Sequence, residues 1–280
     1  MMKQISILFS LLFFFSLQSQ QNFRFIQYLT QENKHREAIY LLNAHELSDP
    51  DTTNYLLGMN YYLLRKPDSA SFYFHQVPHG SAFFLPSAYY SDLNLAYTKD
   101  FSAALELARK LPSDTARGIN QLRIMFVAGT ELLSRHPDIY DSISKKFLYN
   151  DHLYSAEQNK LDGLANELKH MKRKSPVVAG LLSAAIPGAG KFYSGKRGAG
   201  MAAFITNLAF AGMAYEAYYR TGSVKSPQFI VFGSIFAFFY TGNIMGSVFS
   251  VRHQIRTDNN RINNEILATL HIPLVRIFKP

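Results

Sequence analysis

The chain has 280 residues, of which 48% are hydrophobic, and a formal net charge of +9. Its length allows about two domains. The absence of cysteine excludes a disulfide framework, a thiolate metal site and a thiol nucleophile. The excess of positive charge is concentrated beside the apolar segments of residues 175–251, where cations attract anionic lipid headgroups. We therefore expect the lipid bilayer, and no nucleic acid, as a partner.

The first residues have the pattern of a signal peptide. Lys3 precedes an apolar run from Ile5 to Leu17, and a short polar stretch from Gln18 to Gln21 follows it. At roughly 13 residues the run is shorter than a typical membrane span. We predict a signal peptide over residues 1–20, with an uncleaved anchor as the alternative. With either form we expect the segment that follows to be exported to the periplasm.

Residues 22–174 show helical spacing of apolar residues and an internal repeat. When the stretch that begins at Leu56 is set over the stretch that begins at Tyr90, an offset of 34 residues, Ala70 falls on Ala104 and Pro78 on Pro112. A period of this length is typical of helix-turn-helix units that cover one another's apolar faces. The pattern predicts a helical repeat domain.

The repeated stretches resemble the tetratricopeptide family. The similarity lies in a small residue, Gly58, within a first helix, in Ala70 and Ala104 within second helices, and in a closing proline. It covers Leu56 to Pro112 well and the flanking residues loosely. The resemblance implies about three and a half stacked units with a concave groove that binds a protein partner.

Aromatic residues are concentrated in this domain. Tyr61, Tyr62, Phe83 and Phe84 are candidates for partner binding, because aromatic anchors dominate the energy of many interfaces. The alternative is that these rings pack between helices in place of leucine. Phe83 and Phe84 lie between two prolines, and we expect them to be the most exposed of the set.

Residues 175–251 form the predicted membrane module. The segments from Ala199 to Tyr219 and from Gln228 to Val251 are each long enough to cross a hydrocarbon core of about 30 Å. The preceding segment, Ser175 to Gly190, reaches only about 24 Å as a helix. It is either a re-entrant segment or a third crossing, and of the two we favour three crossings.

A glycine-rich stretch joins the first apolar segment to the second. Gly190 to Arg197 matches a phosphate-binding loop except at its last position, where Arg197 replaces the hydroxyl that binds Mg²⁺. We therefore expect a membrane turn and no nucleotide site. The residues predicted to form this turn are Pro187, Gly188, Gly190, Tyr193 and Gly195.

The pattern from Ser175 to Gly200, S-P-x-x-A-x-x-L-S-x-x-I-P-G-x-G-x-x-Y-x-G-x-x-x-x-G, resembles an uncharacterised family of bacterial membrane proteins. In that family a Pro-Gly-x-Gly turn precedes a transmembrane hairpin. The resemblance extends to about Arg256 and implies a membrane domain of unknown function. It implies no activity.

Small and polar residues within the two long segments predict helix packing. Gly242 and Gly246 form a G-x-x-x-G pattern that allows close approach of helices, while Asn207 and Asn243 lie in apolar surroundings at similar depths and could face each other. Structural pairing is one interpretation. The other is a solute path, which two helices can enclose only as a homo-oligomer.

Residues 252–280 are predicted to form an amphipathic tail. Ile262, Ile266 and Leu270 recur among Asn and Arg residues, which favours a helix lying on the membrane surface. A short extended end follows it.

The sequence predicts an all-α protein in which a tetratricopeptide-like helical repeat array precedes a module of two or three transmembrane helices. It contains no H-E-x-x-H or G-x-S-x-G motif, so we expect no enzyme, no catalytic residue, no cofactor and no metal. The favoured function is a scaffold anchored in the bacterial inner membrane that binds a protein partner, within an envelope assembly or secretion complex. The alternative is a small oligomeric channel or transport accessory.

Overall fold

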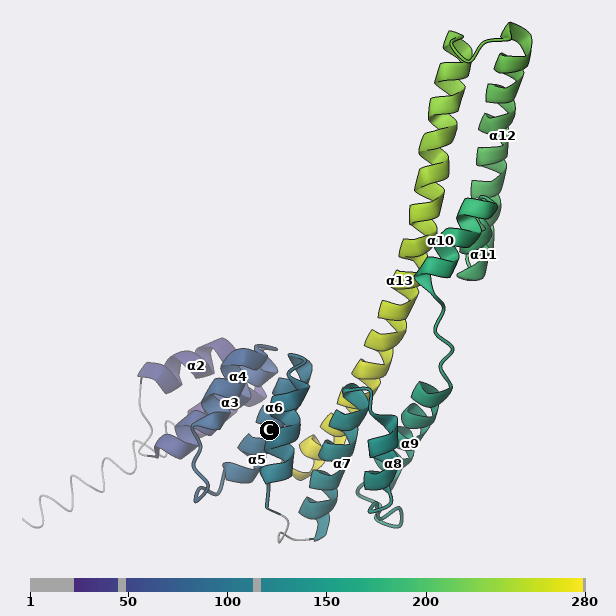
Figure 1. Cartoon of the computed structure of the whole chain (residues 1–280). Coiled ribbons are helices and arrows are strands. Elements are labelled where there is room, and N and C mark those ends of the chain that lie inside the picture. Colours follow the sequence, from purple (N-terminus) through teal and green to yellow (C-terminus); the bar gives the residue numbers. More distant parts are fainter. Residues whose placement is uncertain (1–22, 45–48, 113–116, 279–280) are drawn as a thin grey trace, which may run out of the picture. The chain divides into compact units, whose positions relative to one another are not determined.

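The computed structural model describes residues 23–44, 49–112 and 117–278, so the predicted signal peptide lies outside the described residues. The described residues form helices, turns and loops, with no strand among them. The chain divides into two compact units (Figure 1). Unit 1 holds residues up to Lys169 together with those from Asn264 onward, and unit 2 holds His170 to Asn263.

Unit 1 is built from helices that follow one another as antiparallel pairs. Consecutive helices from α2 to α8 pack against each other. After a helix over residues 23–31, the described helices are α2 (His35–Ala44), α3 (Pro50–Leu63), α4 (Pro67–His75), α5 (Phe84–Tyr97), α6 (Phe101–Lys110), α7 (Arg117–Leu133), α8 (Pro137–Ser144) and α9 (Ser155–His170).

The same turn joins the two helices of each pair. Asn33, Arg65, Lys99 and Arg135 have φ values of 59°, 58°, 68° and 66°, and they are the non-glycine residues with positive φ among those described. In each turn the next residue donates its backbone N–H to the carbonyl five residues earlier, as in the bond from Lys66 to Tyr61 of 3.0 Å. This pattern caps the carbonyls at the end of the first helix.

Small residues allow the helices of unit 1 to approach closely. Ala70 and Ala104, which the repeat alignment superimposes, are fully buried. A methyl group placed on Gly58 would come within 2.5 Å of the Phe74 ring, so this glycine leaves the space that the ring occupies. The helical pairs are thus present at the predicted positions.

The tail differs from its prediction. Helix α13 (Pro227–Ile277) continues without interruption through Pro273, so the expected extended end is wrong. Pro273 removes one backbone hydrogen bond from the helix, but the apolar residues around it compensate for the loss by their burial within unit 1. These buried residues are Ile266, Leu267, Leu270 and Leu274.

Unit 2 consists of α10 (Pro176–Ala185), α11 (Ala189–Tyr193), α12 (Arg197–Thr221) and the first part of α13. By length and composition, α12 and α13 are the described helices that could cross a membrane. Helix α10 has ten residues, which span only about 15 Å. The expectation of three crossings is therefore not met, because the chain turns back after α10 and the two long helices form a hairpin.

The core of unit 1 contains one carboxyl group without a partner. Asp92, on α5, has no exposed surface, and neither of its carboxyl oxygens has a hydrogen-bond partner. Loss of solvation raises the pKa of Asp92 well above its usual value of 3.8. Burial therefore favours the neutral form of Asp92 in the folded protein.

Replacing Asp92 should change how stability depends on pH. Above a pH of about 4 the unfolded chain releases the Asp92 proton more readily than the folded chain does, so wild-type stability should fall with rising pH relative to that of Asp92→Asn. Denaturant unfolding of both full-length proteins in mild detergent between pH 4 and 7 measures this difference. Asp138→Asn, at an exposed carboxyl, serves as the control. Parallel curves for wild type and Asp92→Asn would contradict the account.

Candidate functional site

The inner groove of unit 1 holds the end of the chain's own C-terminal helix. The ring of His271 lies 5.9 Å from that of Tyr62 on α3, and the ring of Phe278 lies 5.8 Å from that of Tyr89 on α5. The Tyr90 hydroxyl donates a hydrogen bond of 3.1 Å to the carbonyl of Phe278. Burial lowers the pKa of His271. Unit 1 thus packs around the C-terminal helix of its own chain, and we call the surface that this helix covers the inner groove.

Later helices of unit 1 hold the same segment by packing and by charge. A methyl group on Gly129 of α7 would lie 2.8 Å from Leu270 Cδ1, so this glycine makes room for the leucine. The guanidinium of Arg276 pairs with Glu157 of α9 at 2.9 Å, and Lys160 pairs with Glu265. The C-terminal helix thus contacts α3, α5, α7 and α9.

The four aromatic residues predicted to bind a partner have different surroundings. Tyr62 is the one that contacts the C-terminal helix, while Tyr61 stacks on Tyr73 at 5.4 Å. Phe83 stacks on Tyr55 at 4.7 Å, and Phe84 lies 4.0 Å from the ring of His79. Both phenylalanines are half-buried, as are Tyr61 and Tyr62, whereas Phe72 and Tyr97 of the same domain are exposed, so the expectation that Phe83 and Phe84 are the most exposed aromatic residues is wrong.

More exposed aromatic side chains lie elsewhere in unit 1. Tyr40 on α2 is 71% exposed, and Phe25 and Tyr28 on the preceding helix stack on each other with about half of their surface exposed. Phe25 and Tyr40 line one shallow groove together with Leu41. This surface lies outside the well-aligned repeats, so the repeat pattern did not indicate it.

The glycine-rich turn of unit 2 brings three helices into backbone contact. Gly188 has a φ of +89°, and a methyl group on it would lie 2.2 Å from the carbonyl oxygen of Gly200 on α12. A methyl group on Gly190 would lie 2.0 Å from the carbonyl oxygen of Ala179 on α10. Pro187, in the turn that leads into α11, prevents α10 from continuing. The predicted turn is therefore a close contact between backbones.

Tyr193 and Gly195 complete the turn. The Tyr193 hydroxyl accepts a hydrogen bond of 3.0 Å from the backbone N–H of Ser175. Gly195 has a φ of +87°, and Lys196 donates its N–H to the carbonyl of Lys191, which is the same capping pattern as in unit 1. The five turn residues thus lie together as the spacing indicated.

Hydrogen bonds between buried serines connect this turn to α13. These serines were not among the predicted site residues. Ser183 and Ser247 share a hydrogen bond of 2.7 Å, and the N–H of Gly190 donates to Ser183 Oγ at 2.9 Å. Ser194 and Ser250 share another of 3.0 Å. Ser247 and Ser250 are three residues apart, which places them on one face of α13. This S-x-x-S spacing is the sequence pattern that could have indicated them.

The residues predicted to pack the two long helices do so only in part. Asn207 donates to the carbonyl of Ala203, and Asn243 donates to the carbonyl of Ser183 at 3.5 Å. Because the side-chain oxygen of each asparagine has no hydrogen-bond partner, the two side chains are not bonded to each other. Gly246 contacts the Lys191 side chain, whereas nothing would lie within 4 Å of a methyl group on Gly242.

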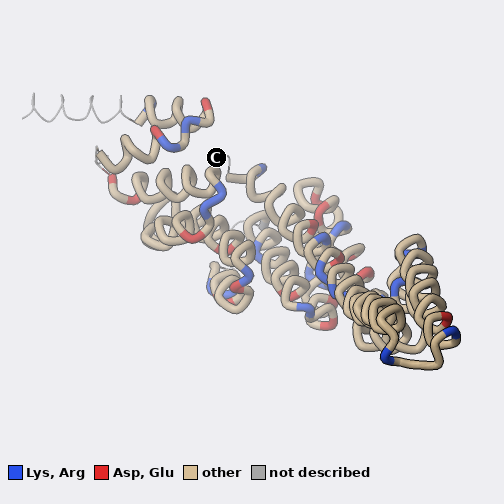
Figure 2. The backbone as a smooth tube through the Cα atoms, turned by 90° about the horizontal axis from the view of Figure 1, so that it is seen from above, with Lys and Arg blue, Asp and Glu red and all other residues tan. Residues whose placement is uncertain are grey.

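The charges of the chain are divided unevenly. Unit 2 contains eleven Lys and Arg residues against two acids, Glu216 and Asp258, so its net charge equals the +9 of the whole sequence. Figure 2 shows acidic and basic residues mixed in unit 1 and mostly basic ones in unit 2. Most of these cations lie at the base of the hairpin, by which we mean the linker 171–175, the α11–α12 turn and α13 from Arg252 to Arg261.

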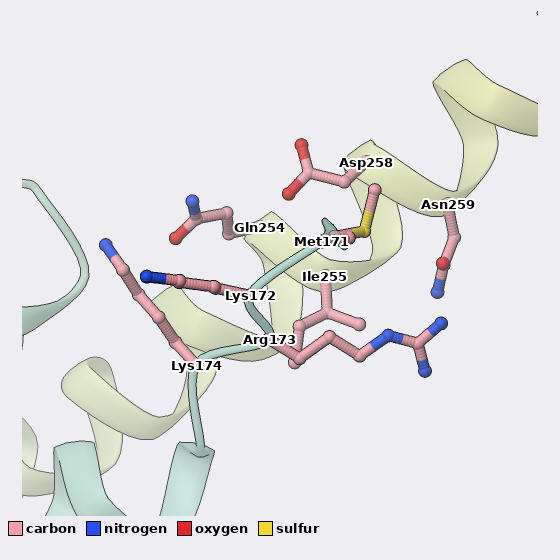
Figure 3. A pocket seen from close by; sticks show the side chains of 8 residues that line it. All are labelled: Met171, Lys172, Arg173, Lys174, Gln254, Ile255, Asp258 and Asn259. Carbon is pink, nitrogen blue, oxygen red and sulfur yellow. The ribbon is translucent and has the colours of Figure 1, made fainter. Parts of the chain in front are cut away.

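A small pocket forms where the linker passes α13. It is lined by Met171, Lys172, Arg173 and Lys174 from the linker and by Gln254, Ile255, Asp258 and Asn259 from the helix. In Figure 3 the side chains of Lys172 and Lys174 extend to the same side as that of Gln254. The Gln254 side-chain oxygen is buried without a partner. The pocket is thus basic, with one carboxylate.

The described residues contain no cluster of His, Asp or Glu that could hold a metal ion. Comparison with protein-family models, curated proteins and solved structures finds no match for this chain. The groove of unit 1 and the basic base of unit 2 are therefore judged on their geometry alone.

Removing the side chain of Leu270 should destabilise unit 1. Leu270 is fully buried beside Gly129, and cutting such a leucine to alanine costs about 2–5 kcal/mol. Thermal or denaturant unfolding of full-length Leu270→Ala in mild detergent measures the loss. Ile272→Ala, on the same helix but half-exposed, should cost less than half as much. Equal effects would show that the groove does not bind this helix.

Adding a methyl group at Gly190 should disrupt the turn of unit 2. Gly190→Ala places a carbon against the Ala179 carbonyl, and such overpacking costs about 1–3 kcal/mol or more. Gly212→Ala on α12 has open space around its new methyl group and should stabilise the helix by up to about 1 kcal/mol. Unfolding in detergent and protease resistance of the two variants provide the comparison. A stable Gly190→Ala protein would contradict the close contact.

Proposed function

We propose that this chain is a non-enzymatic scaffold that is anchored in the bacterial inner membrane by the α12–α13 hairpin and binds a protein partner through unit 1. The observation that carries the proposal is the path of the chain. It leaves unit 1 after Lys169, passes through the two helices long enough to cross a membrane, and returns to unit 1 at Asn264. One folded unit is therefore attached to the hairpin at both ends.

This path favours an even number of crossings. Unit 1 contains both Tyr90 and Phe278, which are joined by a hydrogen bond, so the two ends of the hairpin must lie on the same side of the bilayer. Two crossings meet this requirement and three do not. The exposed apolar side chains of the hairpin suit a hydrocarbon environment, among them Leu208, Ile230 and Phe238.

Export is the second part of the proposal. The signal-peptide pattern of residues 1–20 supports export of unit 1 to the periplasm. Under this orientation the basic base of the hairpin faces the outer leaflet of the inner membrane. The tip between α12 and α13 then faces the cytoplasm.

We infer that the partner binds outside the inner groove. That groove holds the C-terminal helix, and among the exposed aromatic residues of unit 1 the neighbouring Phe25, Tyr28 and Tyr40 form the surface that we assign to a protein partner. Clustered exposed aromatic side chains are typical anchors of interfaces. The groove supports this role indirectly, because its filling stabilises the unit that displays the aromatic surface.

Crosslinking in intact cells tests the proposal. A photo-reactive amino acid at Tyr40 of the full-length chain should give a discrete protein adduct, whereas the same group at Lys99, an exposed turn residue, should not. The protein should also remain in the membrane fraction after alkaline carbonate extraction. Identical adducts at both positions, or none, would contradict the binding surface, and release by carbonate would contradict the anchor.

A further inference from the structure

We propose that the α11–α12 turn at the base of the hairpin binds the phosphate of an anionic phospholipid, with Lys174, Lys196 and Arg197 as its ligands. Clustered cations beside a membrane helix recognise anionic headgroups. The proposal rests on the membrane anchor of the proposed function and not on the partner of unit 1. It assigns a lipid class to one place in unit 2.

Three contacts bring the Lys174 ammonium group to this turn. The backbone N–H of Ser175 donates to the Tyr193 hydroxyl at 3.0 Å, which fixes the end of the linker against α11. The Lys174 Nζ lies 5.8 Å from the centroid of the Tyr193 ring. It would also lie 3.9 Å from a methyl group placed on Gly195. Lys174 therefore meets the backbone position that directly precedes Lys196 and Arg197.

None of these three cations forms an ion pair with an acid within the part of the chain that the structure describes. Of the two acids of unit 2, Glu216 pairs with Arg220 near the opposite end of α12, and Asp258 lines the pocket that Lys172 and Lys174 also line, without an ion pair to Lys174. Lys196 and Arg197 are both exposed. Gathering like charges without a counterion is unfavourable, and a phosphate bound between them would remove that cost through charge-assisted hydrogen bonds.

The start of α12 adds backbone donors to the same place. Lys196 is the residue before the helix, and its side chain makes no capping hydrogen bond. The first N–H groups of α12 lack an intrahelical acceptor and form the positive end of the helix dipole. An anion held by Lys196 and Arg197 lies where these N–H groups are available.

The surface around the turn favours a lipid over free phosphate. Val177 and Leu181 on α10, Phe192 on α11 and Met201 on α12 are large apolar side chains that remain exposed. They lie on the helices that adjoin Lys174 and the α11–α12 turn. The acyl chains of a lipid would cover these apolar side chains while its headgroup contacts the cations. Inorganic phosphate would leave the same side chains exposed to water.

Native mass spectrometry of the full-length protein in mild detergent tests the site. With added phosphatidylglycerol or phosphatidylcholine, wild type should retain phosphatidylglycerol preferentially. A triple variant, Lys174→Gln with Lys196→Gln and Arg197→Gln, should bind it roughly a hundredfold more weakly. The matched control is Lys99→Gln with Lys145→Gln and Lys146→Gln, which removes three exposed cations of unit 1 and should bind like wild type.

The remaining outcomes separate the possible failures. Equal loss in both triple variants would overturn the site, because net charge alone would explain binding. Competition by inorganic phosphate as effective as that by phosphatidylglycerol would overturn the assignment to a lipid. If the triple variant has a lower unfolding temperature than wild type, the single variant Arg197→Gln is tested instead. An unchanged preference of Arg197→Gln for phosphatidylglycerol over phosphatidylcholine would overturn the proposal. Lack of lipid preference in a wild type that resists carbonate extraction would refute the site and leave the anchor standing.

Discussion

Burial of the last turns of α13 in the groove of unit 1 is the interaction on which the architecture depends. Leu270 and Leu274 are buried there away from water, and the Arg276 guanidinium forms an ion pair with the buried Glu157. A helix that is apolar on one side gains its stability from such packing more than from its own propensity. The chain thereby leaves unit 1 after α9 and returns to it through the end of α13, and the hairpin becomes an insertion between the two.

Two kinds of turn make this arrangement possible. In unit 1 the left-handed residues Arg65, Lys99 and Arg135 end one helix and begin the next with the same hydrogen bonds, so each pair has the same local geometry. In unit 2 the glycines of the turn allow backbones to touch, and buried serines hold α10 and α11 against α13. Left-handed residues cost little in the first case because the capping bonds compensate for them.

The division of charge gives the two units different roles. Unit 1 is electrically balanced, and unit 2 carries the whole excess of positive charge. Charges near a membrane surface act over about a Debye length, so in the proposed anchor the cations at the base of the hairpin would act on headgroups. An anchor of this kind combines apolar insertion with a preference for anionic lipids.

The amino-acid sequence was sufficient for properties that depend on neighbouring residues. The helical period, the lengths of the two long apolar segments and the turn from Pro187 to Gly195 could all be read from spacing, because each is governed by local backbone geometry. Spacing did not predict three other features. These are the packing of Tyr62 against His271, the partial burial of Phe83 and the return of residues 264–278 to unit 1. The hydrogen bond from Tyr90 to Phe278 joins residues 188 positions apart. From the sequence alone, any amphipathic helix of the chain could cover the inner groove of unit 1. Complementary shape decides which helix does so, and it exists only after the helices have packed.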